Sequence, residues 1–174
     1  MNQLVALSLS ISILGGLWVF LALGPLAGAV LVWAGFIAWG CYFHTGGDNA
    51  ALQKTIASMV YGAIIAGIAL LLIVNNPVAL PAAAAAPVYV AVTVFLLVIV
   101  ASFNLLSTVP ANVYGYAATV AYALQTPTAE GVGPLASLTA VNMSNPVLLL
   151  SLSFVLGAVF GMASGKAAGL LGKK

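Results

Sequence analysis

The residues that could carry chemistry in this chain are few, and three of them lie in one short stretch. His44, Asp48 and Lys54 flank a Gly46-Gly47 pair that separates two apolar segments. A histidine can change charge near neutral pH, so His44 and Asp48 could form a gate or a cytoplasmic mouth of a membrane path. The simpler interpretation makes His44 a polar helix end, Asp48 a helix cap, and Lys54 an anchor at the membrane interface.

The remaining ionisable and nucleophilic side chains do not form a catalytic set. The chain has one histidine, two acidic residues and one cysteine, Cys41, which lies in an apolar run and is expected to pack there. The sequence Gly46-Gly47-Asp48 lacks the lysine and hydroxyl residue that end a phosphate-binding loop. We therefore expect no enzyme activity, no cofactor and no metal site. The four lysines are too few and too scattered to bind nucleic acid.

Composition places the chain in a membrane. Hydrophobic residues make up 64% of the sequence and charged residues 3%, whereas soluble domains carry about 25% charged residues. Too few groups are present to solvate a soluble surface. We predict an all-α membrane protein, with residues 1–174 forming a single integral membrane domain and lipid as its surroundings.

Breaks in the apolar pattern divide the chain into six predicted transmembrane helices. The fifth is the shortest, and three prolines between Pro77 and Pro87 predict an extended or interfacial connection before the fourth. The longest polar connection covers residues 126–145 and contains Glu130. The predicted helices cover residues 4–23, 26–44, 50–74, 88–106, 110–125 and 146–171.

Six crossings place all four lysines on one face of the membrane. Lys54 and the C-terminal group of Lys166, Lys173 and Lys174 then share a side, and Glu130 lies opposite. The positive-inside rule makes that side the cytoplasm. Both termini are therefore predicted to be cytoplasmic, with the first apolar segment kept as a helix rather than cleaved as a signal peptide.

A pattern shared by the second and fifth segments predicts an inverted repeat. Gly35-Phe36, Ala38 and Tyr42 match Gly115-Tyr116, Ala118 and Tyr122 at an offset of 80 residues. The third and sixth segments also match, with Gly62-Ala63 and Ala66 against Gly157-Ala158 and Gly161. The first and fourth segments show no clear match. Two three-helix halves, residues 1–76 and 87–174, would then have opposite orientations, as in many transporters and channels.

The matched positions fall on one helical face and suggest a solute path. Small residues there leave room for a solute or for close helix packing, and tyrosine adds a hydroxyl group. Helix packing with ordinary interfacial tyrosines is the alternative interpretation. The predicted path residues are Gly35, Phe36, Ala38, Trp39, Tyr42, Gly115, Tyr116, Ala118 and Tyr122.

The last segment carries a glycine at every fourth position: Gly157, Gly161, Gly165 and Gly169. Such a ridge predicts a tight helix contact, either within one protomer or between protomers. A homo-oligomer or a membrane-complex partner is therefore expected.

Motifs in order along the chain resemble a known family. They are Trp33-Ala-Gly-Phe36, Tyr42-Phe43 followed by Gly46-Gly47, Val109-Pro110 followed by Gly115, and Gly157-x-x-Phe160-Gly161. Together they are similar to the YcdZ-like family of small bacterial inner-membrane proteins (domain of unknown function 1097). The resemblance implies a multi-pass protein of the bacterial inner membrane and supplies no substrate or functional residues.

Two functions fit the sequence. The first is a channel or facilitator for a small neutral solute such as urea, an amide, ammonia or a similar metabolite, because no charge is expected near the centre of a helix. The second is a structural or accessory subunit of a larger membrane complex with no transport activity.

Overall fold

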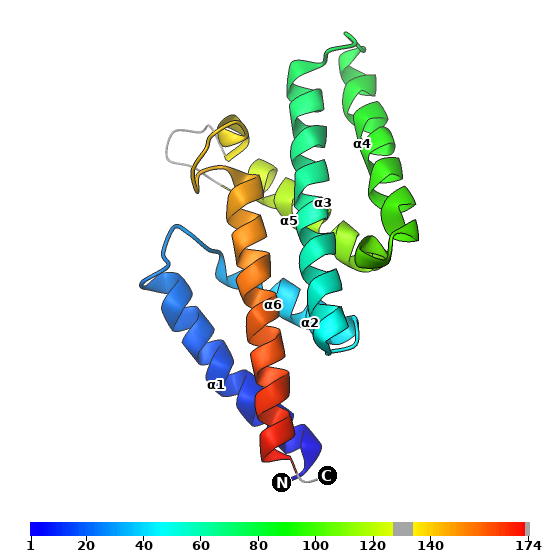
Figure 1. Cartoon of the computed structure of the whole chain (residues 1–174). Coiled ribbons are helices and arrows are strands. Elements are labelled where there is room, and N and C mark those ends of the chain that lie inside the picture. The colour runs from blue at the N-terminus through cyan, green and yellow to red at the C-terminus, as the bar shows by residue number, and fades with distance from the viewer. Residues whose placement is uncertain (127–133, 173–174) are drawn as a thin grey trace. The chain divides into compact units, whose positions relative to one another are not determined.

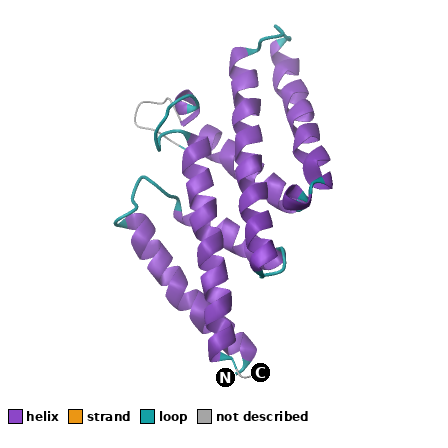
Figure 2. Ribbon diagram, viewed as in Figure 1, coloured by secondary structure: helices purple, strands orange, loops and turns teal. Residues whose placement is uncertain are grey.

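The computed structural model describes residues 1–126 and 134–172, and these residues form helices joined by turns and loops (Figures 1 and 2). No strand occurs in these two ranges. The fold is therefore all-helical, as predicted. The α-helices are α1 (Gln3–Leu23), α2 (Val32–His44), α3 (Asn49–Asn75), α4 (Ala82–Ile99), α5 (Val109–Gln125) and α6 (Pro146–Leu171), with 3-10 turns η1 (Val100–Ser102), η2 (Asn104–Leu106) and η3 (Pro134–Ser137).

Four helical segments are long and apolar enough to cross a membrane: Gln3–Leu23, Asn49–Asn75, Ala82–Ser102 and Pro146–Leu171. The helices α2 and α5 have 13 and 17 residues. At about 1.5 Å per residue they are shorter than a hydrocarbon core of about 30 Å. The described residues thus contain four full-length candidate spans and two short helices between them.

The second helix begins later than the sequence pattern predicts. It was expected from residue 26, but residues 24–29 form turns and α2 starts at Val32. Pro25 follows the end of α1, and Gly28 adopts a left-handed backbone with a φ of 78°. Because an α-helix cannot include that conformation, the apolar residues between Leu26 and Leu31 lie outside the helix.

The fourth helix begins earlier than predicted. The prolines between Pro77 and Pro87 were expected to keep the chain extended, but α4 starts at Ala82 and contains Pro87. Five consecutive alanines, the residue with the highest helix propensity, lead into this proline. Pro87 costs one backbone hydrogen bond and does not end the helix. At the other end, the expected helical residues 100–106 form the 3-10 turns η1 and η2.

Two compact units account for the packing. One comprises residues 1–56 and 152–174, and the other comprises residues 57–151. The boundary falls inside α3 and inside α6, so each unit takes part of both long helices. These units differ from the predicted three-helix halves, residues 1–76 and 87–174. The inverted repeat that would relate those halves stays a prediction.

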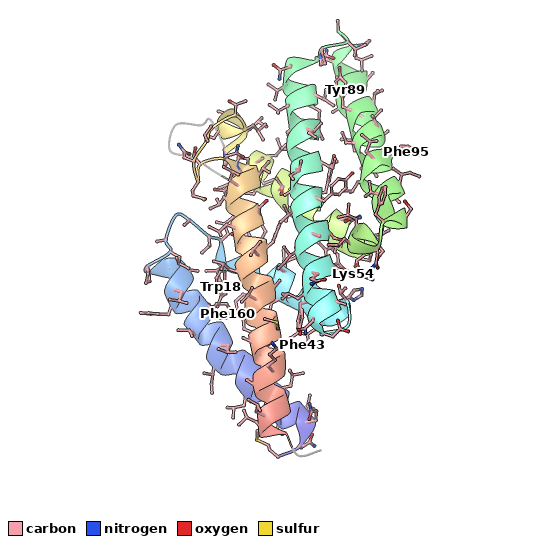
Figure 3. All side chains as sticks on the ribbon, in the orientation of Figure 1. Trp18, Phe43, Lys54, Tyr89, Phe95 and Phe160 are labelled. Carbon is pink, nitrogen blue, oxygen red and sulfur yellow. The ribbon has the colours of Figure 1, made fainter. Side chains whose placement is uncertain are left out.

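In the unit of residues 1–56 and 152–174, aromatic side chains fill the space between α1, α2 and α6. Trp18 and Phe160 lie side by side, with ring centroids 5.4 Å apart, and Trp39 packs against Phe160 at 5.9 Å (Figure 3). The indole nitrogen Nε1 of Trp39 donates to Ser164 Oγ at 3.0 Å. Ser10 Oγ donates to the Ser164 carbonyl oxygen at 2.9 Å, which ties α1 to α6.

In the unit of residues 57–151, α3 and α4 form an antiparallel hairpin (Figure 1). Near its turn, Tyr89 donates its hydroxyl to Asn76 Oδ1 at 3.0 Å. Farther along, the Tyr61 hydroxyl donates to the Leu96 carbonyl at 2.9 Å. Phe95 points away from α3 and is 64% exposed (Figure 3). The apolar outer face of α4 is thus the kind of surface that lipid chains solvate.

Candidate functional site: two short helices held by serine and glycine

The start of α2 is fixed by two side chains from the long helices of its unit. Ser153 Oγ, on α6, accepts a hydrogen bond from the Leu31 backbone N–H at 2.9 Å. The Trp18 indole, on α1, donates to the Val32 carbonyl at 3.0 Å. Because Leu31 precedes the helix, its N–H would have no partner within the helix, and the serine supplies one.

Immediately after this start, α2 crosses α6 at two glycines. A β-carbon at Gly157 would collide with the carbonyl oxygen and the backbone carbons of Gly35. A β-carbon at Gly35 would in turn collide with the Trp18 ring. Only hydrogen fits at either position, so the two backbones meet directly.

The next glycines along α6 lie progressively farther from α2. A β-carbon at Gly161 would lie 3.0 Å from the Tyr42 ring and 3.2 Å from the Trp39 ring. At Gly165 the nearest atom would be in Phe43, at 3.5 Å, and at Gly169 no atom lies within 4 Å. The ridge thus packs within the protomer at Gly157 and Gly161, and its last glycine is free of intramolecular contact among the described residues.

The other short helix, α5, crosses α3 in the same way. A β-carbon at Gly62 would collide with the Asn112 carbonyl oxygen, and one at Gly115 would collide with the Met59 backbone. Gly62 also lies against the Tyr116 backbone nitrogen. Each short helix therefore meets a long helix backbone at glycine, once in the α2–α6 crossing at Gly157 and twice in the α3–α5 crossing at Gly62 and Gly115.

A serine on α3 also bonds to the segment before a short helix, but it donates where Ser153 accepts. Ser58 Oγ donates to the carbonyl of Leu105, in the 3-10 turn before α5, at 3.5 Å. Ser58 and Ser153 both stand four residues before the glycine of the crossing, within the shared pattern Ser-x-Val-x-Gly-Ala. Sequence reasoning matched Gly62-Ala63 with Gly157-Ala158 and missed the serine and valine. The same offset of 95 residues would have found them.

Asn112 is the most deeply buried amide near these crossings. Its side chain is fully buried, and its Nδ2 donates to the carbonyls of Leu97 and Leu106 at 3.2 and 3.1 Å. Its Oδ1 accepts no hydrogen bond from the described residues. The Leu97 and Leu106 carbonyls are oxygen acceptors, and their positions require the nitrogen of the amide to face them. The acceptor oxygen therefore points away from both carbonyls.

Two hydroxyl groups lie one turn farther along α5. Tyr116, four residues after Asn112, places its hydroxyl 3.2 Å from Thr93 Oγ1 on α4. Thr93 is buried, and its hydroxyl also donates to the Tyr89 carbonyl at 2.8 Å. Asn112 and Tyr116 share one face of α5 because residues four apart are neighbours on a helix.

A family profile described as "Protein of unknown function (DUF1097)" matches residues 8–169, nearly the whole chain. The chain belongs to the DUF1097 family. This agrees with the resemblance found in the sequence motifs. No curated protein and no solved structure gives a significant match to this chain.

The predicted path residues of this DUF1097 protein lie in different surroundings. On α2, Gly35, Ala38 and Tyr42 are buried, and Tyr42 donates its hydroxyl to the Gly47 carbonyl. Trp39 is buried, whereas Phe36 is 40% exposed and stacks on Trp39 with centroids 5.7 Å apart. The α2 stripe thus takes part in packing with α6.

On α5, the predicted path residues form a second set within their own unit. Gly115 and Ala118 are buried, and Tyr116 and Tyr122 are partly buried. Within the described residues, Tyr116 is the member of this set with a polar contact to a neighbouring helix, through Thr93.

The charged stretch after α2 forms a helix boundary. Asp48 Oδ1 accepts a hydrogen bond from the Ala51 N–H at 2.7 Å, so Asp48 caps α3 as the simpler interpretation expects. Gly46 and Gly47 both have positive φ, which accounts for the glycine pair at this turn. His44 is exposed in the last turn of α2. Glu130, Lys173 and Lys174 lie outside the described residues.

Proposed function

We propose that this DUF1097 protein is a multi-pass facilitator for a small neutral solute in a bacterial inner membrane, built from two inverted three-helix repeats. The observation that carries the proposal is the repeated Ser-x-Val-x-Gly-Ala pattern. In each copy, the glycine of a long helix meets the backbone of a short helix, and the serine bonds to the segment before that short helix. Paired short helices that follow a non-helical segment are typical of transporter sites.

Helix lengths support the repeat. The span Gln3–Leu23 would open the first half and Ala82–Ser102 the second half, and both have 21 residues. The spans that would close the two halves, Asn49–Asn75 and Pro146–Leu171, have 27 and 26 residues. A long–short–long order thus occurs twice, including in the first and fourth segments, where the sequences show no clear match.

Six crossings with cytoplasmic termini follow from this proposal. The short helix α2 would complete its crossing with residues 24–31, and α5 would do so with residues 103–108. Non-helical backbone at membrane depth is tolerated where protein covers it. The hydrogen bond from the Leu31 N–H to Ser153 and the one from Ser58 to the Leu105 carbonyl supply such cover.

A neutral solute is favoured because charges are absent from the relevant surroundings. Residues 57–126 and 134–151, the described part of one unit, contain no charged side chain. An ion there would lose its hydration without a countercharge, which is costly in a low-dielectric interior. Polar groups without charge suit a neutral solute, and we propose no catalytic step.

Stopped-flow light scattering tests the proposal. Proteoliposomes with the purified protein and protein-free vesicles would be exposed to gradients of urea, acetamide, ammonia and glycerol. We expect faster re-entry of at least one solute in the protein-containing vesicles. Rates equal to those of empty vesicles for every solute would contradict a facilitator.

A second candidate function is a structural or accessory subunit. It is favoured by the direct contact of Gly35 with Gly157, because the α2 stripe is then occupied by packing. Gly169 tests this alternative, since no atom lies within 4 Å of its added β-carbon. If the ridge also joins protomers, Gly169→Leu should lower the oligomer mass seen by native mass spectrometry without unfolding the monomer. An unchanged mass would remove the ridge as the assembly surface.

A further inference from the structure

The buried oxygen of Asn112 lacks a donor in surroundings where other polar groups are satisfied. Its Nδ2 makes two hydrogen bonds, and the Thr93 and Thr119 hydroxyls bond to backbone carbonyls at 2.8 Å. A buried acceptor without a donor destabilises the fold, because it has lost its hydrogen bond to water. A native protein retains such a group where a water or a ligand supplies the missing donor.

The position of this oxygen selects the kind of donor. Asn112 lies in the first turn of α5, which begins at Val109, and a helix N-terminus carries a partial positive charge. No acidic side chain occurs among residues 57–126 and 134–151 to offset a bound cation. Both features disfavour a cation and leave a neutral N–H or O–H donor.

The next polar groups along the same face suit a solute that has a second N–H donor. The Thr93 and Tyr116 hydroxyls are 3.2 Å apart, and either atom can be the donor of their hydrogen bond. Because Thr93 Oγ1 donates to the Tyr89 carbonyl, its proton is already engaged. The Tyr116 hydroxyl is therefore the donor to Thr93 Oγ1, and its oxygen keeps a lone pair that can accept a hydrogen bond from a solute.

We propose that Asn112 Oδ1 is a solute-binding acceptor that takes a hydrogen bond from an N–H group of urea or a short primary amide. The Tyr116 hydroxyl oxygen is the following contact along α5 and accepts from a second N–H of the solute. The role of Asn112 in transport rests on the proposed function. Binding of the solute at Asn112 does not depend on transport.

Binding can be tested without changing the protein. Ala111-Asn112 is the sole Ala-Asn pair in the sequence, so labelling with ¹³C-alanine and ¹³C,¹⁵N-asparagine identifies the Asn112 backbone amide and connects it to the side-chain amide in detergent micelles. Its side-chain resonance is then followed by NMR during titration with urea. Tetramethylurea is the matched control, because it keeps the carbonyl and has no N–H group. We expect a saturable shift with urea and none with tetramethylurea.

Two NMR results would overturn the binding site. One is the absence of a urea-dependent shift while the resonance shows exchange with water, which would make the partner of Asn112 a water only. The other is an equal shift with urea and tetramethylurea, which would exclude recognition through N–H.

Transport tests the same residues separately. Tyr116→Phe removes one hydroxyl and keeps the ring, and we expect it to lower urea flux roughly three- to tenfold, as for one lost hydrogen bond. Tyr114→Phe is the matched control, because Tyr114 is exposed on the same helix. Asn112→Leu should lower the flux further, although it also removes the two bonds to Leu97 and Leu106.

The outcomes separate this inference from the proposed function. Urea flux that is unchanged in a folded Tyr116→Phe variant would remove Tyr116 from the path and leave the facilitator intact. A urea-specific NMR shift without flux in the unaltered protein would support the Asn112 site and overturn the transport function.

Discussion

Gly157 lies so close to Gly35 that a single added carbon would overlap the Gly35 carbonyl oxygen. These glycines belong to α6 and α2, and the contact joins the last helix of the chain to the second. Since the neighbour is backbone, it cannot move aside as the end of a flexible side chain can. The crossing therefore depends on glycine at position 157.

Gly157→Ala is expected to destabilise the protein by about 1–3 kcal/mol, the usual cost of overpacking. Alanine favours a helix over glycine by about 1 kcal/mol, which offsets part of this loss. The measurement is the melting temperature in detergent, followed by size-exclusion chromatography. Gly169→Ala is the control on the same helix, and it should leave the melting temperature unchanged or slightly raised. Equal effects of the two substitutions would argue against the Gly35 contact.

Gly62→Ala should have an effect similar to that of Gly157→Ala, because a β-carbon at Gly62 would meet the Asn112 carbonyl oxygen. Gly16→Ala on α1 is the control, since no atom lies within 4 Å of its added carbon. The same thermal melts provide the readout. A tolerated Gly62→Ala would weaken the inference that the two crossings are repeats of one another.

Asp48→Ala should destabilise α3 by about 1 kcal/mol, because the Ala51 N–H loses its acceptor. Asp48→Asn retains an oxygen at that position and should be close to the unaltered protein. The two variants would be compared by thermal melts at neutral pH. If Asp48→Asn is as damaging as Asp48→Ala, the negative charge rather than the cap is the important feature.

Cysteine labelling distinguishes six crossings from four. Single cysteines at Asn49 and Asn142, both exposed, would be placed in a Cys41→Ala background. With six crossings, a membrane-impermeant maleimide should label Asn142→Cys in intact bacterial cells and Asn49→Cys only after permeabilisation. If α2 and α5 do not cross, both positions would lie on the same side of the membrane. Equal labelling of both in intact cells would therefore contradict the six-crossing topology.

The helices that end at strong breaks could be predicted closely from the sequence. The Gly24-Pro25 and Asn75-Asn76-Pro77 breaks placed the ends of α1 and α3 within one residue of the structure. The predicted starts of α2 and α4 were wrong, because the apolar pattern does not determine the backbone conformation at these positions. Apolar residues 26–31 have a composition typical of a helix, but they include Gly28, whose backbone is left-handed. The alanines before Pro87 form a helix in spite of the proline.

The site could be predicted in part. Glycine spacing indicated tight packing on α6, and the partner of that ridge, α2, emerged only from the structure. Ser58 and Ser153 were missed because serine is common in apolar helices and its partner lies far away in sequence. Asn112 could not be predicted from the sequence, since its burial depends on the packing of α3 and α4 around it.

The contacts of α2 also constrain the order in which the protein can be assembled. Leu31 and its partner Ser153 are 122 residues apart in the chain, whereas Ser58 and Leu105 are 47 apart. During synthesis, α3 is made before α5, so α5 can pack on it at once. The partner of α2 is α6, which is synthesised last, so α2 cannot make this contact until α6 has left the ribosome. Until then, the Leu31 N–H and the backbone face at Gly35 remain uncovered. A chain stopped before α6 would thus leave the start of its second helix without the serine and the glycine that cover it.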